Sequence, residues 1–158
     1  MVDEKILKDI EEAKILSIFK NIYNDYSNYK EKNALRNMLS ISPDKLTTLK
    51  QMIKRKYDSD FSEMQLKRLC ELVEAFLKKS EYRKRISEEL KNSLLITQNH
   101  KCAICNIMIN ESAPADHIVP FKYVGDELSD NIQMLCKKCN EKKNDSIDYQ
   151  IRFLLKLV

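Results

Sequence analysis

Two Cys-x-x-Cys pairs restrict the folds open to this chain more than any other feature of its sequence. Cys102 and Cys105 form the first pair, and Cys136 and Cys139 form the second, with residues 106–135 between them. Each pair can turn two sulfur atoms towards one point, and two pairs supply the tetrahedral four-thiolate shell that zinc prefers. We therefore predict a structural Zn²⁺ ion at these four cysteines. Because a four-sulfur shell has no open position, any chemistry must come from other residues.

The alternative explanations of these cysteines are buried free thiols and a redox-active motif, but a redox motif needs one pair rather than two. The chain begins with acidic rather than basic residues, and no segment has the ~18 consecutive apolar residues of a membrane span. We therefore expect a cytoplasmic protein that does not enter a membrane, in a compartment where disulfides are rare. The fifth cysteine, Cys70, falls in an apolar helical stripe and is expected to be an inert buried residue.

Apolar residues recur at helical spacing over most of residues 1–97, and the whole chain contains only one glycine and three prolines. This pattern predicts a helical domain over residues 1–97, whose last helix is expected to run from Ser80 to about Thr97. After Gln98 the helical periodicity stops, and short strand-like segments are expected at 103–109, 115–119 and 131–135. A final helix after Ser146 completes a second domain over residues 98–158. The predicted fold class is therefore α+β.

The sequence of the helical domain does not specify its role. Docking to a protein partner, self-association and DNA binding all stay open, and the last helix of the chain would pack either on the N-terminal helices or in an oligomer interface. The formal net charge of +4 permits a nucleic-acid partner without requiring one. The basic clusters at 54–56 and 83–85 have acidic neighbours, so we interpret them as solvated surface rather than as phosphate-binding patches.

Several polar residues between and after the cysteines are typical of phosphodiester hydrolysis. That reaction needs a base that deprotonates water, a cation that stabilises charge on the phosphate, and groups that align them. His117 suits the first role, whereas the carboxylate of Asp116 and an amide oxygen are hard ligands for a Mg²⁺-type ion. Asn140 lies where a short helix should begin and is expected to point back over Asp116. Lys143, one helical turn later, is expected to meet the phosphate.

At these residues the chain resembles the HNH, or ββα-metal, endonucleases. The resemblance covers roughly residues 95–145 and rests on the two cysteine pairs together with Asp116-His117-Ile118-Val119-Pro120, Asn131-Ile132-Gln133-Met134-Leu135 and Asn140-x-x-Lys143. Members of that family fold as a two-stranded hairpin and a helix around one divalent ion, often supported by a four-cysteine zinc. The resemblance therefore implies a zinc-buttressed ββα-metal domain after the helical region.

Position by position, the resemblance implies that Asp116 and Asn140 hold a catalytic Mg²⁺ or Mn²⁺ ion and that His117 is the general base. Asn131 would orient His117 by holding its loop. Asn140 stands where the family often has a histidine, although asparagine also occurs there in other members. The family's paired glycines before Asn131 are reduced here to Gly125, so the loop is expected to differ in shape.

The implied activity is hydrolysis of DNA, with double-stranded DNA as the expected substrate and a restriction or antiviral defence system as one possible setting. The alternative is a non-catalytic zinc module that binds DNA or a protein partner within a larger assembly. The joint presence of Asp116, His117, Asn131 and Asn140 favours catalysis, because binding alone does not need all four.

Overall fold

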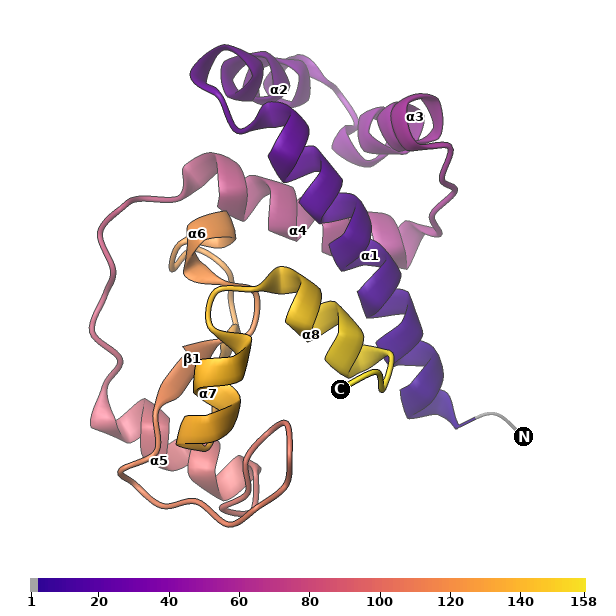
Figure 1. Ribbon diagram of the computed structural model, residues 1–158. Coiled ribbons are helices and arrows are strands. Elements are labelled where there is room, and N and C mark those ends of the chain that lie inside the picture. Colours follow the sequence, from indigo (N-terminus) through magenta and orange to yellow (C-terminus); the bar gives the residue numbers. More distant parts are fainter. Residues whose placement is uncertain (1–2) are drawn as a thin grey trace.

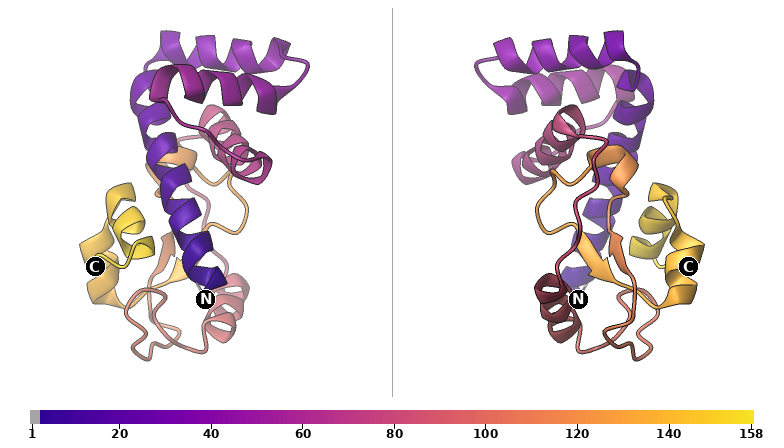
Figure 2. Two further views of the ribbon diagram at one scale, coloured as in Figure 1. Left: turned by 90° about the vertical axis from the view of Figure 1, so that its right-hand side faces the viewer. Right: turned by 90° about the vertical axis from the view of Figure 1, so that its left-hand side faces the viewer.

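The computed structural model describes residues 3–158, and within them helices surround one small sheet (Figures 1 and 2). No helix in that range is both long enough and apolar enough to cross a membrane. The predicted α+β fold class is confirmed. In chain order the elements are α1 (Glu4–Tyr26), α2 (Tyr29–Ile41), α3 (Lys45–Tyr57), α4 (Glu63–Lys78), α5 (Glu88–Thr97), β1 (Ala115–His117), α6 (Phe121–Val124), β2 (Ile132–Met134), α7 (Lys137–Lys143) and α8 (Ile147–Leu154).

The packing of α1 against α4 forms the centre of the helical region. Asp3 caps α1 by accepting a hydrogen bond from the backbone of Lys5, and Ser62 begins α4 in a capping box with Gln65. Both helices turn an apolar face inward, and the ring of Phe19 on α1 packs edge-on against Phe76 on α4, with centroids 6.5 Å apart. Helices α2 and α3 lie at one end of the molecule, and the sheet with α5 and α7 lies at the other (Figure 2).

The apolar core of the helical region continues past residue 97. Val119, Val124 and Ile147 belong to the same buried cluster as the inward side chains of α1 and α4. The ring of Tyr123 on α6 lies 4.5 Å, centroid to centroid, from the ring of Tyr23 on α1. Burial of this shared apolar surface fixes the position of the segment around β1 and α6 relative to α1 and α4.

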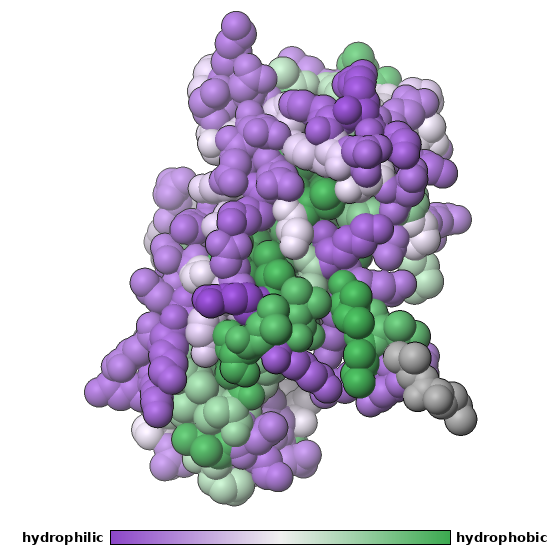
Figure 3. Space-filling model, turned by 45° about the vertical axis from the view of Figure 1, so that its right-hand side comes forward, coloured by the Kyte–Doolittle hydropathy of each residue, from purple (hydrophilic) through white to green (hydrophobic). Residues whose placement is uncertain are grey.

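The last helix, α8, packs along α1, which is one of the two arrangements that its apolar face left open. Ile147 at its start is buried, and the ammonium of Lys20 on α1 lies 2.8 Å from the carboxylate of Asp148. Hydrophobic side chains gather on the surface of this face (Figure 3), and the exposed ones near α8 and the start of α1 are Leu7, Ile10, Leu155, Leu157 and Val158.

Residues 79–87, which we call the connector, are not helical, so the prediction of a helix beginning at Ser80 was wrong. The hydroxyl of Ser80 accepts a hydrogen bond from the backbone of Tyr82, and the backbone N–H of Lys84 donates to the side chain of Asp126. These hydrogen bonds take the place of the backbone hydrogen bonds that a helix would form here. Helix α5 begins only after Ser87, which caps it. The connector runs as an open arc down one side of the molecule (Figure 1).

The sheet has two short antiparallel strands, in which Asp116 on β1 pairs with Gln133 on β2. The first expected strand, at 103–109, is instead a turn closed by a single bridge between Lys101 and Met108, because the chain must fold back for two cysteines to meet. Gly125, after α6, has φ 60° and ψ −141°, a conformation that other residues rarely adopt. A Cβ atom there would lie 2.9 Å from Cβ of Lys79, so the glycine lets the connector approach.

Candidate active site

The four predicted zinc ligands come together at the end of the molecule distant from α2 and α3. The Sγ atoms of Cys102, Cys105, Cys136 and Cys139 all lie within 4.8 Å of one another, and those of Cys105 and Cys136 are 3.7 Å apart. Four Zn–S bonds of about 2.3 Å in a tetrahedron require sulfur atoms about 3.8 Å apart. The cluster therefore has the composition and the spacing for structural zinc.

Within the cluster, the Cys102 thiol differs in its pKa from Cys70, the cysteine that belongs to neither pair. Burial raises the pKa of the Cys102 thiol, but backbone N–H groups of Cys105, Cys136 and Ile104 outweigh it and lower that pKa to about 7, which favours the thiolate that binds metal. Cys70 lies half-buried on α4, away from the cluster, and its thiol faces the carboxylate of Glu74 at 3.7 Å. Burial raises the pKa of Cys70 to about 11, so its thiol stays protonated at neutral pH.

The Asp116 carboxylate has two oxygen atoms in different surroundings. Oδ2 forms an ion pair with the Lys143 ammonium at 2.9 Å and accepts a hydrogen bond from the Gln133 amide at 3.0 Å. Oδ1 has no hydrogen-bond partner within residues 3–158. One carboxylate oxygen is thus held by Gln133, the cross-strand partner of Asp116, and by Lys143 on α7. The other oxygen is available to a ligand.

Lys143 does not lie where the sequence led us to expect it. Its side chain is fully buried beneath α7. Its ammonium donates to the backbone oxygen of His117 at 2.8 Å and forms an ion pair with Asp116. The expected direct contact with a phosphate is not compatible with this position. The physical reason is that the face of α7 that carries Lys143 packs on the sheet. There Asp116 supplies the counter-charge that a buried ammonium requires.

Replacing Lys143 with methionine should destabilise the protein, because it removes one partner of a buried ion pair and leaves the Asp116 carboxylate without compensation. We expect a loss of about 3 kcal/mol in the free energy of unfolding, or on the order of 6–12 °C in melting temperature. Thermal denaturation followed by circular dichroism measures this change. The neighbouring Lys142→Met serves as control, because Lys142 is exposed. Equal shifts for the two variants would contradict the ion pair's importance.

His117 at the end of β1 is buried, and its ring is held on two sides. Its Nε2 lies 2.7 Å from Oδ1 of Asp126, and its ring packs edge-on against Phe121, with centroids 5.5 Å apart. Burial raises the pKa of the Asp126 carboxyl, but the hydrogen bonds from His117 and from the Lys84 backbone outweigh it, so that this pKa lies below its ordinary value. An ionised Asp126 accepts the proton of Nε2–H, and this tautomer places the basic lone pair on Nδ1.

Asn131 fixes the backbone that follows β1. Its amide oxygen accepts from the N–H of Val119, and its amide nitrogen donates to the carbonyl of Val119, both at 2.8 Å. The backbone oxygen of Asn131 also accepts from the N–H of Ile118. The buried side chain of Asn131 therefore holds the turn directly after His117, without contacting the imidazole ring itself.

A pocket of about 240 Å³ is lined by three of the residues that the sequence predicted to be functional. Asp116 and His117 line it from β1, Asn140 lines it from α7, and Phe121 lines it from α6. The three predicted residues are thus brought together around one space. A carboxylate and an amide are oxygen donors of the kind that Mg²⁺ and Mn²⁺ bind, with water or a phosphate filling the other positions, so the donor set fits such an ion.

Sequence reasoning missed Asp126 and Arg83, and it also missed Asn144 and Asp145, which line the same pocket after the end of α7. Asp126 lies nine positions from His117 in a loop. No periodicity links them, and the only available signal was an acid directly after the glycine of that loop. Arg83 belongs to a basic cluster that we interpreted as solvated surface.

Residues 102–155 match the family model described as HNH endonuclease, about a third of the chain. No curated protein and no solved structure matches the chain. The matched segment contains both cysteine pairs, the sheet, α7 and α8, whereas the connector and the helices before it lie outside. The resemblance noted in the sequence is therefore confirmed over residues 102–155, which match the HNH endonuclease family model.

Proposed function

We propose that this protein is an endonuclease that hydrolyses phosphodiester bonds of double-stranded DNA with the help of Mg²⁺ or Mn²⁺. The observation that carries the proposal is the pairing of His117 Nε2 with Asp126 beside a pocket that Asp116 and Asn140 also line. The match of residues 102–155 to the HNH endonuclease family model supports nuclease activity in general. The ion, the DNA substrate and the residue roles are parts of the proposal.

In the proposed reaction, Nδ1 of His117 takes a proton from a water molecule. Nδ1 has no hydrogen-bond partner within residues 3–158, and Asp126 keeps Nε2 protonated, so Nδ1 is the nitrogen able to act as base. The water oxygen then forms a bond to phosphorus as the bond to the leaving oxygen breaks, and the leaving oxygen gains a proton from water. Asp126 stabilises the imidazolium that results.

Asp116 and Asn140 would hold the divalent ion, Asp116 through the carboxylate oxygen that Lys143 and Gln133 leave free. When bound, such an ion stabilises the negative charge on the phosphate and on the leaving oxygen. Asn131 acts through the backbone by fixing the turn after His117, and Lys143 positions Asp116. Neither of these two residues touches the substrate in this proposal.

Cleavage should therefore depend on an added divalent ion in protein whose four-cysteine site already holds zinc. Supercoiled plasmid incubated with Mg²⁺ or Mn²⁺ should be nicked or linearised at least about 10²-fold faster than without either ion. Gel electrophoresis measures this, with RNA of the same sequence as a parallel substrate. Absence of cleavage of plasmid, linear duplex and single-stranded DNA with both ions would contradict the proposal. It would favour the non-catalytic zinc module.

A further inference from the structure

The connector between α4 and α5 is attached to the site on both sides of Arg83. The backbone N–H of Lys84 donates to Oδ2 of Asp126 at 2.7 Å, and the Lys79 ammonium donates to the backbone oxygen of Lys122. Oδ1 of the same Asp126 carboxylate pairs with the imidazole of the proposed base. The connector thus shares a residue with the active site, although it lies outside the segment that matches the HNH family.

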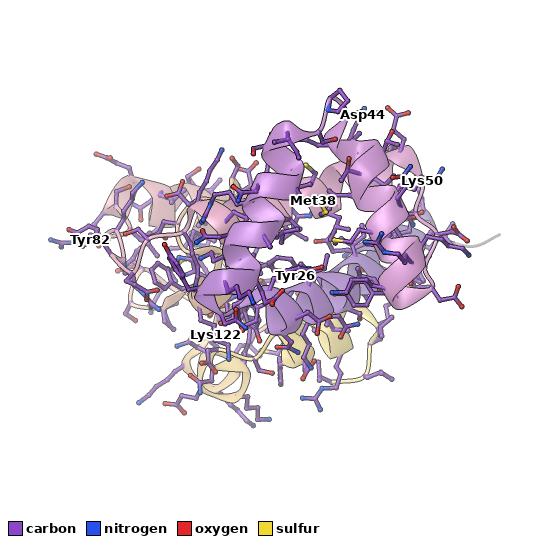
Figure 4. All side chains as sticks on the ribbon, turned by 90° about the horizontal axis from the view of Figure 1, so that it is seen from above. Tyr26, Met38, Asp44, Lys50, Tyr82 and Lys122 are labelled. Carbon is purple, nitrogen blue, oxygen red and sulfur yellow. The ribbon has the colours of Figure 1, made fainter. Side chains whose placement is uncertain are left out.

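Arg83 lines the pocket that Asp116 and His117 also line. Its guanidinium carbon lies 4.5 Å from the centroid of the Phe121 ring, and Phe121 in turn packs against His117. The preceding residue, Tyr82, is 76% exposed and lies at the edge of the molecule, pointing away from the helices (Figure 4). Stacking on the ring face holds the guanidinium while its N–H donors stay available to a ligand.

Arg83 differs from the other charged side chains in and beside the pocket in having no partner for its charge within residues 3–158. Asp116 and Asp145 both line the pocket, and without a cation they would repel an anionic phosphate. The ammonium of Lys143 is buried and bound to Asp116, and that of Lys122 lies 3.5 Å from Asp145. Within residues 3–158 the guanidinium of Arg83 has neither an ion-pair partner nor a hydrogen-bond partner, so its donors are not committed to the protein.

We propose that Arg83 binds the phosphate group that is cleaved. This inference rests on the proposed nuclease function and adds a substrate-binding residue to it. A guanidinium can donate two parallel hydrogen bonds to two phosphate oxygens. Attack of water adds negative charge to those oxygens, so the contact strengthens in the transition state and acts on kcat more than on KM. The connector thereby completes an active site whose other residues lie in the HNH segment.

The test compares Arg83→Gln with Arg85→Gln in the full-length, zinc-loaded protein. Both variants remove one positive charge from the same cluster, but Arg85 does not line the pocket. We expect Arg83→Gln to lower kcat for plasmid cleavage by about 10- to 100-fold, because a charge-assisted hydrogen bond is lost. Arg85→Gln should change kcat by less than about 3-fold. Arg83→Lys should fall between Arg83→Gln and wild type, since it keeps the charge without the paired donors.

Zinc content and melting temperature should stay close to wild type in all three variants, because both arginine side chains are exposed. Equal loss of kcat in Arg83→Gln and Arg85→Gln would overturn the inference, and so would a loss confined to KM. Either result leaves the proposed function intact, provided that the wild-type protein cleaves DNA with Mg²⁺ or Mn²⁺. A wild-type protein that cleaves no DNA with either ion contradicts the proposed function itself.

Discussion

Replacing His117 with alanine should lower the rate of divalent-ion-dependent DNA cleavage by about 10²- to 10⁴-fold, the range expected when a general base is removed. Nδ1 of His117 is the nitrogen left basic by the pairing of Nε2 with Asp126. The measurement is single-turnover cleavage of plasmid with Mg²⁺ or Mn²⁺. Cleavage by His117→Ala at the wild-type rate would contradict the assignment of the base.

The other histidine of the chain provides a matched control for this experiment. His100 is exposed and has φ 55°, a conformation that asparagine tolerates better than most residues, so His100→Asn should keep the wild-type rate. Asp126→Asn tests the pairing itself. It removes the charge that favours the Nε2–H tautomer, and we expect about a 10- to 100-fold loss of activity. A wild-type rate for Asp126→Asn would show that the pairing does not serve catalysis.

The pH dependence of cleavage follows from the direction of the Asp126 shift. Because the pKa of Asp126 is lowered, its carboxylate stabilises the folded state fully above the ordinary value of 3.8, and this stabilisation is lost as pH falls through the lower folded pKa. Between pH 5 and 8, the Asp126 carboxylate therefore stays ionised. We expect no loss of cleavage from protonation of Asp126 within that window, and a pH–rate profile measures this.

Loss of one zinc ligand should have the largest structural effect. Cys102→Ser should lower bound zinc from about one ion per chain to nearly none. Apparent zinc-binding energies of about 10–16 kcal/mol are comparable to the whole stability of an ordinary domain, about 5–15 kcal/mol, so residues around the cluster should unfold. Cleavage should disappear with them, although no residue of the proposed catalytic pocket is changed. Atomic absorption measures the zinc, and limited proteolysis locates the unfolding.

The core of α1 and α4 does not include the cysteine cluster, so it should survive in Cys102→Ser and keep most of the helical circular dichroism. Cys70→Ser is the matched control, because Cys70 lies on α4 and belongs to neither cysteine pair. It should keep the zinc and the activity of the wild type. Undiminished zinc in Cys102→Ser would show that the four-thiolate site is assigned wrongly.

Local sequence patterns determined much of the fold and of the candidate site. Apolar residues recur about once per helical turn along α1 and α4. Because this pattern depends only on neighbouring residues, it located both helices from the sequence. The cysteine pairs located the metal cluster, because two residues three positions apart meet by local geometry alone. The sequence also predicted that Asp116, His117 and Asn140 share one site, because zinc at the four cysteines would hold the two ends of their segment together.

The tertiary structure alone decided the contacts between residues with no common periodicity. The sequence predicted a helix from Ser80. In the structure the backbone N–H of Lys84 instead donates to Asp126, and the side chain of Lys79 donates to the backbone oxygen of Lys122. Packing on Phe121 places the guanidinium of Arg83 beside the site, although Arg83 is exposed. Lys143 is buried because α7 packs its charged face on Asp116, a pairing that depends on the arrangement of helix and sheet. The composition and spacing of the sequence indicate which residue types can bind a ligand. Which residue each charged side chain pairs with depends on distances that only the folded chain sets.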